Sequence, residues 1–422
     1  MGRPMRWSTL AVPPLRENTE IGVNVIYAFT GFLPDQAINE TVASITAMAL
    51  LSPQVQHQLI PQAHSPEQDE TLVEKIREFR GGMFGRFQQQ IDAAIAPLGA
   101  APQEQQYRTA RATLDADAEI QEIHRQRGVW QDRLWQQVLD EIAADRPRLE
   151  AAYETHRRGP ATLELDPNLE LPGHQVKTNI HRMPGGYLGR LADDGLTTGA
   201  LYDHGTFVYG GGWFGGLSDE LGQTVIHNVV QTHYPDLAPT AILDLGCAVG
   251  HSTLPYAQAF PEARVHAIDV GSALLEYASA RASALGQTVH FSQQNAEGTG
   301  FADGSFDLVV SHILFHEIPA VARRRVFAES CRLLKPGGLM VHLESRMFLD
   351  PPSLVSRYFR DTEVWVNHEP FLGSSKFADF PGYAEAAGFG PGEFQIHYVP
   401  GYYSAKWQKN TAGWAAFCGV RA

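Results

Sequence analysis

The stretch Ala241-Ile-Leu-Asp-Leu-Gly-Cys-Ala-Val-Gly250 decides the fold. Its first five residues, Ala241–Leu245, are mainly apolar and predict a buried strand. Gly246 and Gly250 let the backbone turn sharply and approach a ligand closely, because glycine has no Cβ. Residues 254–260 follow with a helical pattern. A strand, a glycine-rich turn and a helix in this order predict one unit of a parallel α/β sheet with a ligand against the turn.

The same alternation continues over the rest of the C-terminal half. The pattern predicts helices over 218–232, 254–260, 273–285 and 320–334, and strands over 241–245, 264–269, 289–293, 306–311, 338–344, 393–399 and 414–421. Strands that alternate with helices form a parallel sheet with helices on both faces. We therefore predict an α/β, doubly wound, Rossmann-like domain of seven strands over residues 218–422, whose last two strands form an antiparallel pair at the sheet edge.

Residues 1–158 predict a mainly α-helical N-terminal domain. The segment Ser65-Pro66-Glu67-Gln68 is typical of a helix start, because serine caps a helix and proline suits its first position. Gly81-Gly82 predicts a break in that helix. Tryptophan and aliphatic residues recur at helical spacing over 129–149, which favours helix packing over a cofactor-binding role. We expect this domain to cover the substrate, to form a homodimer, or to do both.

Residues 159–217 are rich in glycine, proline and aromatic residues and predict a linker or a lid. This composition disfavours a regular helix anywhere in the segment. The run Tyr209–Gly216 contains five glycines and three aromatic residues. Such a run can lay rings over a ligand as a flexible lid, or it can pack them into a crevice as a tight connection. The sequence leaves both interpretations open.

The composition excludes several classes of protein. The 422 residues include 47 acidic against 33 basic side chains, and the formal net charge of −14 disfavours a nucleic acid partner. Three isolated cysteines, Cys247, Cys331 and Cys418, predict neither a disulfide framework nor a structural zinc site. The sequence has no signal-like apolar segment at its start and no run of about 18 apolar residues. We therefore expect no membrane span and a cytoplasmic protein.

Polar residues follow three successive predicted strands. Asp244 lies at the glycine-rich turn, where its charge suits a cationic amino group better than a pyrophosphate. Asp269 ends the next strand, where an acid can accept hydrogen bonds from ribose hydroxyls. Asn295 and Ala296 follow the third strand, where an amide side chain and backbone amides can read the edge of an adenine. Ala248 takes the usual place of a second glycine, which further disfavours a dinucleotide site.

The motifs ILDLGCAVG, VHAIDVG, QNAEGTGFADGSFDLVVSHILFHEIP and RLLKPGGLMV occur in this order between residues 241 and 345. In sequence and spacing they resemble class I S-adenosylmethionine-dependent methyltransferases, especially those of ubiquinone and menaquinone biosynthesis. The resemblance extends over about 200 residues with its flanking elements, within 218–422, and leaves the first 200 or so without a counterpart. It implies that the cofactor is S-adenosyl-L-methionine (SAM).

The resemblance also implies roles for individual residues. The methionine part of SAM would lie against Gly246, Ala248, Gly250 and Asp244, the ribose against Asp269 and Val270, the adenine against Asn295 and Ala296, and the sulfonium beside Ser311 and His312. Two of these residues depart from the family pattern. Ala248 replaces a glycine, and Asn295 stands where aspartate is common, although its amide oxygen can still accept from the adenine amino group.

A general base is needed if the acceptor is a hydroxyl or a carbon acid. His316 with Glu317 is the best-placed pair, because it follows the fourth strand and an adjacent acid can orient an imidazole. His312 is a second candidate. Asp203 with His204 is a third, which would reach the site from the lid. For each of them, packing or capping of a loop is the alternative role.

Other residues have weaker claims. His312 and His316 are four residues apart, but Glu317 follows the second histidine instead of following the first, so the order of a zinc helix is absent and we expect no metal. The remaining candidates can line a substrate pocket or pack at the sheet edge: Tyr402, Tyr403, Trp407 and His368.

We therefore expect a methyltransferase that transfers a methyl group in line to the oxygen or carbon of a small, hydrophobic or aromatic acceptor. The alternative is a SAM-binding protein of the same fold that transfers no methyl group, either cyclase-like or recruiting a partner through its helical domain. The completeness of the cofactor site favours the enzyme. Methylation of protein or RNA ranks third, with RNA disfavoured by the net charge and by the lack of a basic tract. An NAD-dependent oxidoreductase ranks lower because of Ala248 and Asp244.

Overall fold

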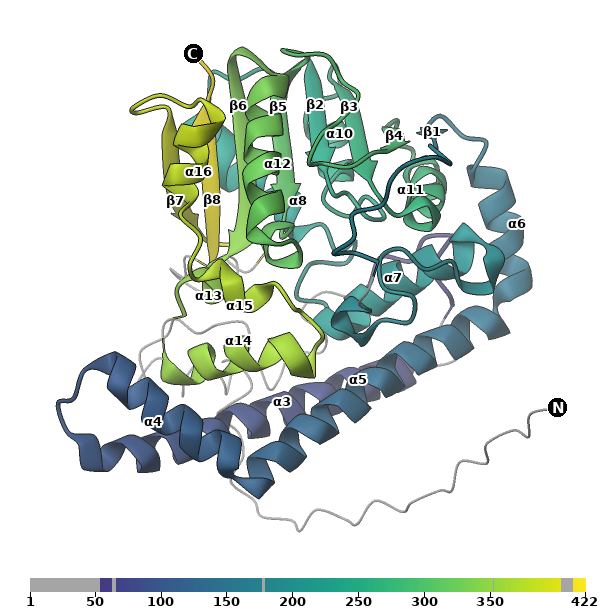
Figure 1. Ribbon diagram of the computed structural model, residues 1–422. Helices are drawn as coiled ribbons and strands as arrows, with labels where there is room; N and C mark the ends of the chain where they lie inside the picture. The colour runs from purple at the N-terminus through teal and green to yellow at the C-terminus, as the bar shows by residue number, and fades with distance from the viewer. Residues whose placement is uncertain (1–53, 63–65, 177–178, 352, 404–412) are drawn as a thin grey trace.

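The computed structural model describes residues 54–62, 66–176, 179–351, 353–403 and 413–422. Figure 1 shows a twisted sheet with helices on both faces and a layer of long helices across one end of it. Ser65, Trp407 and the first 53 residues, about which the sequence makes predictions, lie outside this described part.

The sheet has eight strands in the order β1-β4-β3-β2-β5-β6-β8-β7. Their bounds are β1 (Thr162–Glu164), β2 (Ala241–Leu245), β3 (Arg264–Asp269), β4 (His290–Gln293), β5 (Phe306–His312), β6 (Leu334–Ser345), β7 (Phe394–Val399) and β8 (Trp414–Val420). Strand β8 runs antiparallel to both of its neighbours, β6 and β7, and the other pairs are parallel. The predicted doubly wound α/β fold is confirmed, with the antiparallel pair at its edge.

The seven strands predicted over 218–422 are confirmed as β2–β8, and the sheet has one further strand outside that range. Strand β1, which we assigned to the linker, pairs in parallel with β4 and extends the sheet at that edge. All three of its residues are exposed. A short strand without buried residues has neither the alternating nor the continuous apolar pattern by which a strand is recognised in a sequence.

Strand β2 lies at the centre of the fold. Its neighbours are β3 on one side and β5 on the other, so the order of the strands reverses beside it. The crevice outside the carboxyl ends of the strands at such a point is where open α/β sheets bind ligands. Ile242 and Val310 belong to the core on one face of the sheet, and Leu243 and Val309 to the core on the other. Both faces are therefore covered, which explains the continuous apolar runs of these strands.

The helices around the sheet agree with prediction to within a few residues. They are α8 (Glu220–Thr224), a π-helical turn (Val225–Val230), α9 (Gln231–His233), α10 (Leu254–Ala259), α11 (Ser272–Ala284) and α12 (Ala320–Leu333). The segment after β6 adds four helices that were not predicted, α13 (Arg346–Leu349), α14 (Leu354–Val366), α15 (Leu372–Ser375) and α16 (Phe380–Ala387). Ser218 does not cap α8, because its φ of 57° places it in a turn before the helix.

The N-terminal layer consists of α3 (Pro66–Ile95), α4 (Gln103–Ala116), α5 (Ala118–Ala144) and α6 (Arg146–His156). Helix α3 continues through Gly81-Gly82, so the predicted break is wrong. Its last third is secured by the burial of Phe84, Phe87 and neighbouring apolar residues against α14, and tertiary packing outweighs the low helix propensity of glycine. In α5, Leu134, Trp135 and Val138 are buried, as the helical spacing predicts.

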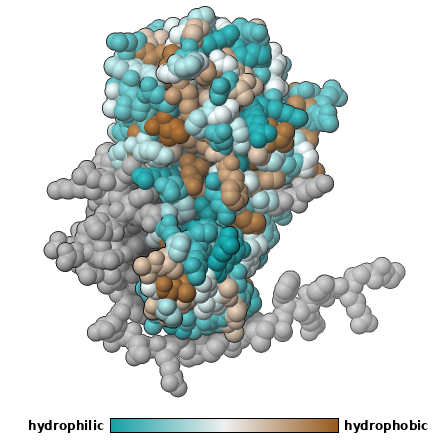
Figure 2. Space-filling model, turned by 60° about the vertical axis from the view of Figure 1, so that its left-hand side comes forward, coloured by the Kyte–Doolittle hydropathy of each residue, from teal (hydrophilic) through white to brown (hydrophobic). Residues whose placement is uncertain are grey.

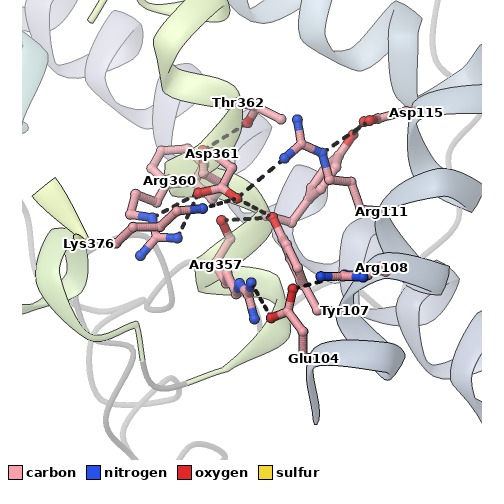
Figure 3. Close-up of polar contacts among 12 residues, drawn as sticks. Glu104, Tyr107, Arg108, Arg111, Asp115, Arg357, Arg360, Asp361, Thr362 and Lys376 are labelled. Carbon is pink, nitrogen blue, oxygen red and sulfur yellow. Dashed lines mark hydrogen bonds and ion pairs between the residues drawn. The ribbon is translucent and has the colours of Figure 1, made fainter. Parts of the chain in front are cut away.

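Polar contacts attach this layer to α14, as Figure 3 shows. The hydroxyl of Tyr107 in α4 donates to Asp361 Oδ2 at 2.7 Å. Arg360 donates to Asp361 Oδ1 at 2.7 Å, and Arg111 and Lys376 lie 3.5 Å and 3.7 Å from its other oxygen. Burial alone would raise the pKa of Asp361, but the Tyr107 hydroxyl, Arg360 and Lys376 lower it. The carboxylate thus joins α4 to α14 while charged.

Helix α7 (Gly195–Gly210) contradicts our expectation that no regular helix would form in 159–217. It begins at Asp194, whose side chain accepts from Thr197 N, and ends at Gly211 with φ 61°. Its glycines do not break it, because they are the points of closest approach to neighbouring helices. A Cβ on Gly199 would lie 2.1 Å from Tyr277 of α11, and one on Gly205 would lie 2.4 Å from Trp135 of α5.

Two observations concern the surface of the described residues. Among them, no helix is both long enough and apolar enough to cross a bilayer. Figure 2 shows small apolar patches separated by hydrophilic residues on the face that it presents. Large apolar side chains that are scattered singly over a surface are normal in soluble domains. This face therefore supplies no argument for a homodimer.

Candidate functional site

Two adjoining hollows open at the carboxyl ends of the central strands. The first has about 780 Å³ of empty space, open solvent included, and the second about 490 Å³. They share five lining residues: Tyr202, Gly246, Ala248, His312 and Ile313. The first hollow extends past β3 and β4, and the second extends toward α8 and the residues after Gly250. Together they form one elongated cleft around the glycine-rich turn.

The glycine-rich turn is fixed by hydrogen bonds to β3. The amides of Gly246 and Cys247 both donate to the Ile268 carbonyl, at 2.8 Å and 3.0 Å. Gly246 has φ 76°, which glycine adopts without strain, and a Cβ there would come within 3.1 Å of Leu314. Ala248 also lies in the left-handed region, with φ 46°. The turn exposes backbone to the cleft where a side chain would fill it.

Two predicted acids face this turn. Asp244 is buried, and its Oδ2 accepts from the Thr253 hydroxyl at 2.6 Å. Its Oδ1 lies 3.3 Å from His312 Nδ1 but makes no hydrogen bond among the described residues. Asp269 lines the first hollow and accepts from the amides of Ala248 and Gly271, at 2.9 Å and 2.8 Å. Burial raises the pKa of Asp269 above its ordinary value.

The far end of the first hollow combines apolar walls with a polar edge. Val270 and Ala296 line it, together with Leu314, Ile318 and Val326. Asn295 also lines it, and the Asn295 Oδ1 accepts from the Glu297 amide at 2.9 Å. An apolar space with an amide at its edge suits an aromatic base.

Three predicted residues lie behind the cleft and do not line either hollow: Gly250, Ser311 and His316. Gly250, with φ 81°, completes the turn. The Ser311 hydroxyl lies 2.7 Å from His342 Nδ1, and burial lowers the pKa of His342 to about 3. By contrast, His312 lines both hollows, and its Nε2 lies 3.0 Å from the Tyr256 hydroxyl.

The two residues of the predicted pair, His316 and Glu317, lie in different positions relative to the cleft. Glu317 lines the first hollow. His316 Nδ1 lies 2.8 Å from Glu344 Oε2, and its Nε2 lies 3.5 Å from Glu317 Oε1. Burial would lower the pKa of His316, but the carboxylates of Glu344 and Glu317 raise it to about 9. An imidazole that is protonated at neutral pH cannot accept a proton there, so this geometry suits a residue that orients Glu317.

Glu317 also contacts a histidine that sequence reasoning missed. His181 Nε2 lies 3.0 Å from Glu317 Oε1, and its Nδ1 lies 3.2 Å from Glu369 Oε1. Tyr187, which lines the cleft, donates from its hydroxyl to the same Glu317 Oε1 at 3.0 Å. We call Glu317, Glu344, Glu369, His181 and His316 the carboxylate–histidine cluster. No local pattern marks His181 or Glu369, because the fold alone brings them to Glu317.

A second missed residue, His251, directly follows the glycine-rich turn and lines the second hollow. Its Nε2 lies 2.6 Å from Asp203 Oδ1, and the Tyr202 ring stacks on its imidazole at 5.6 Å. Asp203 Oδ2 accepts from Arg281 Nε at 2.8 Å and from the Tyr277 hydroxyl at 2.9 Å. Asp203 therefore contacts the site through His251. The position of His251 directly after Gly250 is the signal that could have identified this histidine.

The remaining candidates lie away from the two hollows. His204 is buried between α5 and residue 54, with its Nε2 3.1 Å from Glu141. The Tyr403 hydroxyl donates to Asp219 at 3.1 Å, and Tyr402 stacks on His227. His368 lies 3.4 Å from Arg182. Within the described ranges, no three His, Cys, Asp or Glu side chains converge as metal ligands would.

The residues of the cleft fit SAM. A buried carboxylate oxygen of Asp244 without a hydrogen bond suits a cationic amino group, because an unpaired buried acceptor is unfavourable. Asp269 lies one strand away, at the place of a ribose-binding acid, and the apolar space beside Asn295 suits adenine. These features follow one another along the carboxyl edge of β2, β3 and β4.

Comparison with known proteins agrees with this geometry. Residues 242–338 match the family model described as "Methyltransferase domain". A demethylmenaquinone methyltransferase of Thermus thermophilus is 32% identical over 150 residues, which cover 35% of this chain and 64% of that protein. A malonyl-[acyl-carrier protein] O-methyltransferase of Methylococcus capsulatus is 30% identical over 125 residues, covering 29% of this chain and 42% of that protein.

A similar solved structure is the phosphoethanolamine N-methyltransferase 2 of Haemonchus contortus, with a TM-score of 0.39 and 17% identity over 52% of this chain and 58% of that one. The chain spans less than two thirds of the length of these curated relatives. From the motifs, the fold and the family match, the chain carries a class I S-adenosylmethionine-dependent methyltransferase domain built around residues 242–338.

Proposed function

We propose that this protein transfers the methyl group of SAM to a small, largely apolar acceptor. The observation that carries the proposal is the buried Asp244 Oδ1, which has no hydrogen bond within the described residues, on a side chain that lines the second hollow with Gly246 and Ala248 of the glycine-rich turn. A carboxylate in that state is stabilised by a cationic ligand group. The relatives named as methyltransferases support the same reaction class.

The cofactor is assigned to the elongated cleft. Gly246, Ala248 and Gly250 form the turn beside its methionine part, with Asp244 at the amino group. Asp269 and Val270 would hold the ribose, and Asn295 and Ala296 the adenine. Ser311 acts from behind, because its hydrogen bond with His342 fixes the end of β5 from which His312 projects.

When bound, SAM supplies a methyl group on a positively charged sulfur. The residues of this chain then have three tasks: to orient the acceptor, to exclude water and to receive a proton if the acceptor loses one. His312 and Glu317 line the cleft and are the proposed catalytic residues. His316 is proposed as a positioning residue, because it acts on Glu317 from outside the cleft.

The acceptor is proposed to be hydrophobic or aromatic, with transfer to oxygen or carbon. The cleft walls support this, since Pro172, Tyr187 and Tyr202 add to the apolar residues named above. Helix α7 supplies Tyr202, and α5 packs on the outside of α7, so the N-terminal layer is proposed to cover the substrate. Formation of a homodimer remains a separate proposal, which light scattering of the purified protein would test.

The test is a calorimetric titration with SAM and with its product S-adenosylhomocysteine (SAH), followed by transfer of radiolabelled methyl to a panel of acceptors. We expect micromolar binding of both ligands and label on a phenolic or quinol-like compound. Binding without label on any acceptor would favour a SAM-binding protein that transfers no methyl group. No binding of either ligand would overturn the proposal.

A further inference from the structure

One carboxylate in the cleft has an oxygen that the protein leaves without a partner. Glu317 is 7% exposed and lines the first hollow. Its Oε1 is crowded, because Tyr187, His181 and His316 all lie within 3.5 Å of it. Its Oε2 makes no hydrogen bond with any described residue. A buried acceptor in this state is unfavourable, and a donor on a ligand would relieve it.

Glu317 is held in place by contacts that trace back to α5 and to the linker segment. The carbonyl of His181 accepts from Trp135 Nε1 at 2.9 Å and from Gln131 Nε2 at 2.6 Å, both of α5. On the other side, Gln175 Nε2 donates to the Glu317 carbonyl at 3.0 Å. The orientation of the free Oε2 is thus fixed before any ligand binds, as recognition by a single hydrogen bond requires.

The charge of the surroundings favours a donor over an anion. Burial would raise the pKa of Glu317, but His181 and His316 lower it, so the carboxylate is ionised at neutral pH. Among the described residues that line the two hollows, none is lysine or arginine. Arg323, a nearby guanidinium, donates to the carbonyls of Phe315 and Phe371 behind the cleft. The two imidazoles beside Glu317, those of His181 and His316, already pair with three carboxylates, because they also contact Glu369 and Glu344. An acceptor carboxylate next to Glu317 would therefore add a like charge to a cluster in which carboxylates already outnumber the cations.

We propose that Glu317 selects the acceptor by receiving a hydrogen bond from it, so that the acceptor is an apolar molecule carrying a neutral hydroxyl or a protonated amine and is not a carboxylate. The inference rests on the proposed function, because it assigns the end of the cleft beside Glu317 to the acceptor. It adds the substrate class: an O–H or N–H donor on an apolar skeleton.

The experiment uses four probes with one skeleton and the full-length protein saturated with SAH. The probes are 1-naphthol, 1-naphthylmethylamine, 1-naphthoate and naphthalene. Calorimetric titration should show that the naphthol and the amine bind at least tenfold more tightly than naphthalene. The naphthoate should bind more weakly than naphthalene.

Two variants test whether Glu317 is the cause of this ranking of affinities. Glu317→Gln keeps the size of the side chain but removes its charge, so the preference for the amine over the naphthoate should fall at least tenfold while the affinity for SAH stays the same. The matched control is Glu297→Gln, which removes a carboxylate that lines the same hollow beside Asn295 and Ala296 and that pairs with Arg325. It should leave the probe ranking unchanged.

Three results would overturn the inference. The wild-type protein could bind the naphthoate as tightly as the naphthol, or Glu317→Gln could leave the ranking unchanged, or no donor probe could bind at millimolar concentration although SAH does. The wild-type ranking decides the question by itself if Glu317→Gln fails to fold. A wild-type protein that does not bind SAH would instead overturn the proposed function, and the first titration detects this.

Discussion

At the scale of single residues, His251 offers the sharpest test of where the cofactor lies. It lines the second hollow together with Asp244, at the end of the cleft assigned to the amino-acid part of SAM. We expect His251→Ala to weaken SAH binding at least tenfold. The same variant should bind 5′-methylthioadenosine, which lacks the amino-acid part, as the wild type does. Isothermal titration with the two ligands measures both affinities.

The control for this prediction is Asp269→Asn, which alters the end of the cleft assigned to the ribose. Both ligands contain the ribose, so this substitution should weaken both of them to a similar extent. If His251→Ala also weakened both ligands equally, the second hollow would not hold the amino-acid part, and the assigned direction of the cofactor would be wrong.

His316 gives a prediction for stability at alkaline pH. Its pKa of about 9 in the folded protein lies above its ordinary value of 6.5, so its ion pairs with Glu344 and Glu317 contribute fully below about pH 6.5. The contribution is lost as the pH rises through 9, and it amounts to no more than about 3 kcal/mol. Urea unfolding between pH 6.5 and 9 should show the decline. His316→Gln should flatten it, leaving a part from His181, whose pKa is also raised. An equal decline in both proteins would contradict this.

The residues that the sequence could identify are those at or just after the carboxyl end of a strand. Asp244, Asp269, Asn295 and His312 have a local signal, because the carboxyl ends of parallel strands meet at one edge. His181 has none. It reaches Glu317 from a loop in which its own φ is 56°, and only the packing of α5 against that loop brings it there. Contacts of this kind depend on tertiary structure and cannot be inferred from spacing.

At the scale of elements, α7 tests whether its glycines are required for close packing against neighbouring helices. A Cβ on Gly199 would lie 2.1 Å from Tyr277 Cβ, which is far inside van der Waals contact. Gly199→Ala should therefore lower the free energy of unfolding by about 3 kcal/mol, since overpacking forces α7 and α11 apart. Chemical denaturation followed by circular dichroism measures the change.

The matched substitution is Gly82→Ala in α3. A Cβ there would meet nothing within 4 Å, so alanine should raise the stability by up to about 1 kcal/mol through its helix propensity. Similar effects at both positions would show that packing does not explain α7. The pair also shows why the prediction for 159–217 was wrong: glycine disfavours a helix locally, and a sequence does not reveal that Gly199 and Gly205 are covered by Tyr277 and Trp135.

At the scale of the whole molecule, the sheet was predictable and the position of the helical layer was not. Apolar runs and turns mark each strand of the sheet except the exposed β1. The layer of α3, α4 and α5 is joined to the sheet domain through α14, an unpredicted helix, by contacts such as Tyr107 with Asp361 (Figure 3). Because Trp135 of α5 also donates to the carbonyl of His181, which contacts Glu317, we expect the contacts between the layer and α14 to influence the site.

The buried ion pair of Arg127 in α5 with Glu363 in α14 tests those contacts. Arg127 Nη2 lies 2.5 Å from Glu363 Oε2, and both side chains are almost fully buried. Glu363→Gln should cost about 3–5 kcal/mol, because it leaves the guanidinium without its counter-charge. Adding Arg127→Met should recover at least about 2 kcal/mol of that loss, since the uncompensated charge is then gone. Urea unfolding of both single variants and the double variant gives the coupling. Additive effects would mean that the ion pair does not hold α5 on α14. A loss of SAH affinity in the folded double variant would show that the contacts between α5 and α14 also affect the cofactor end of the cleft.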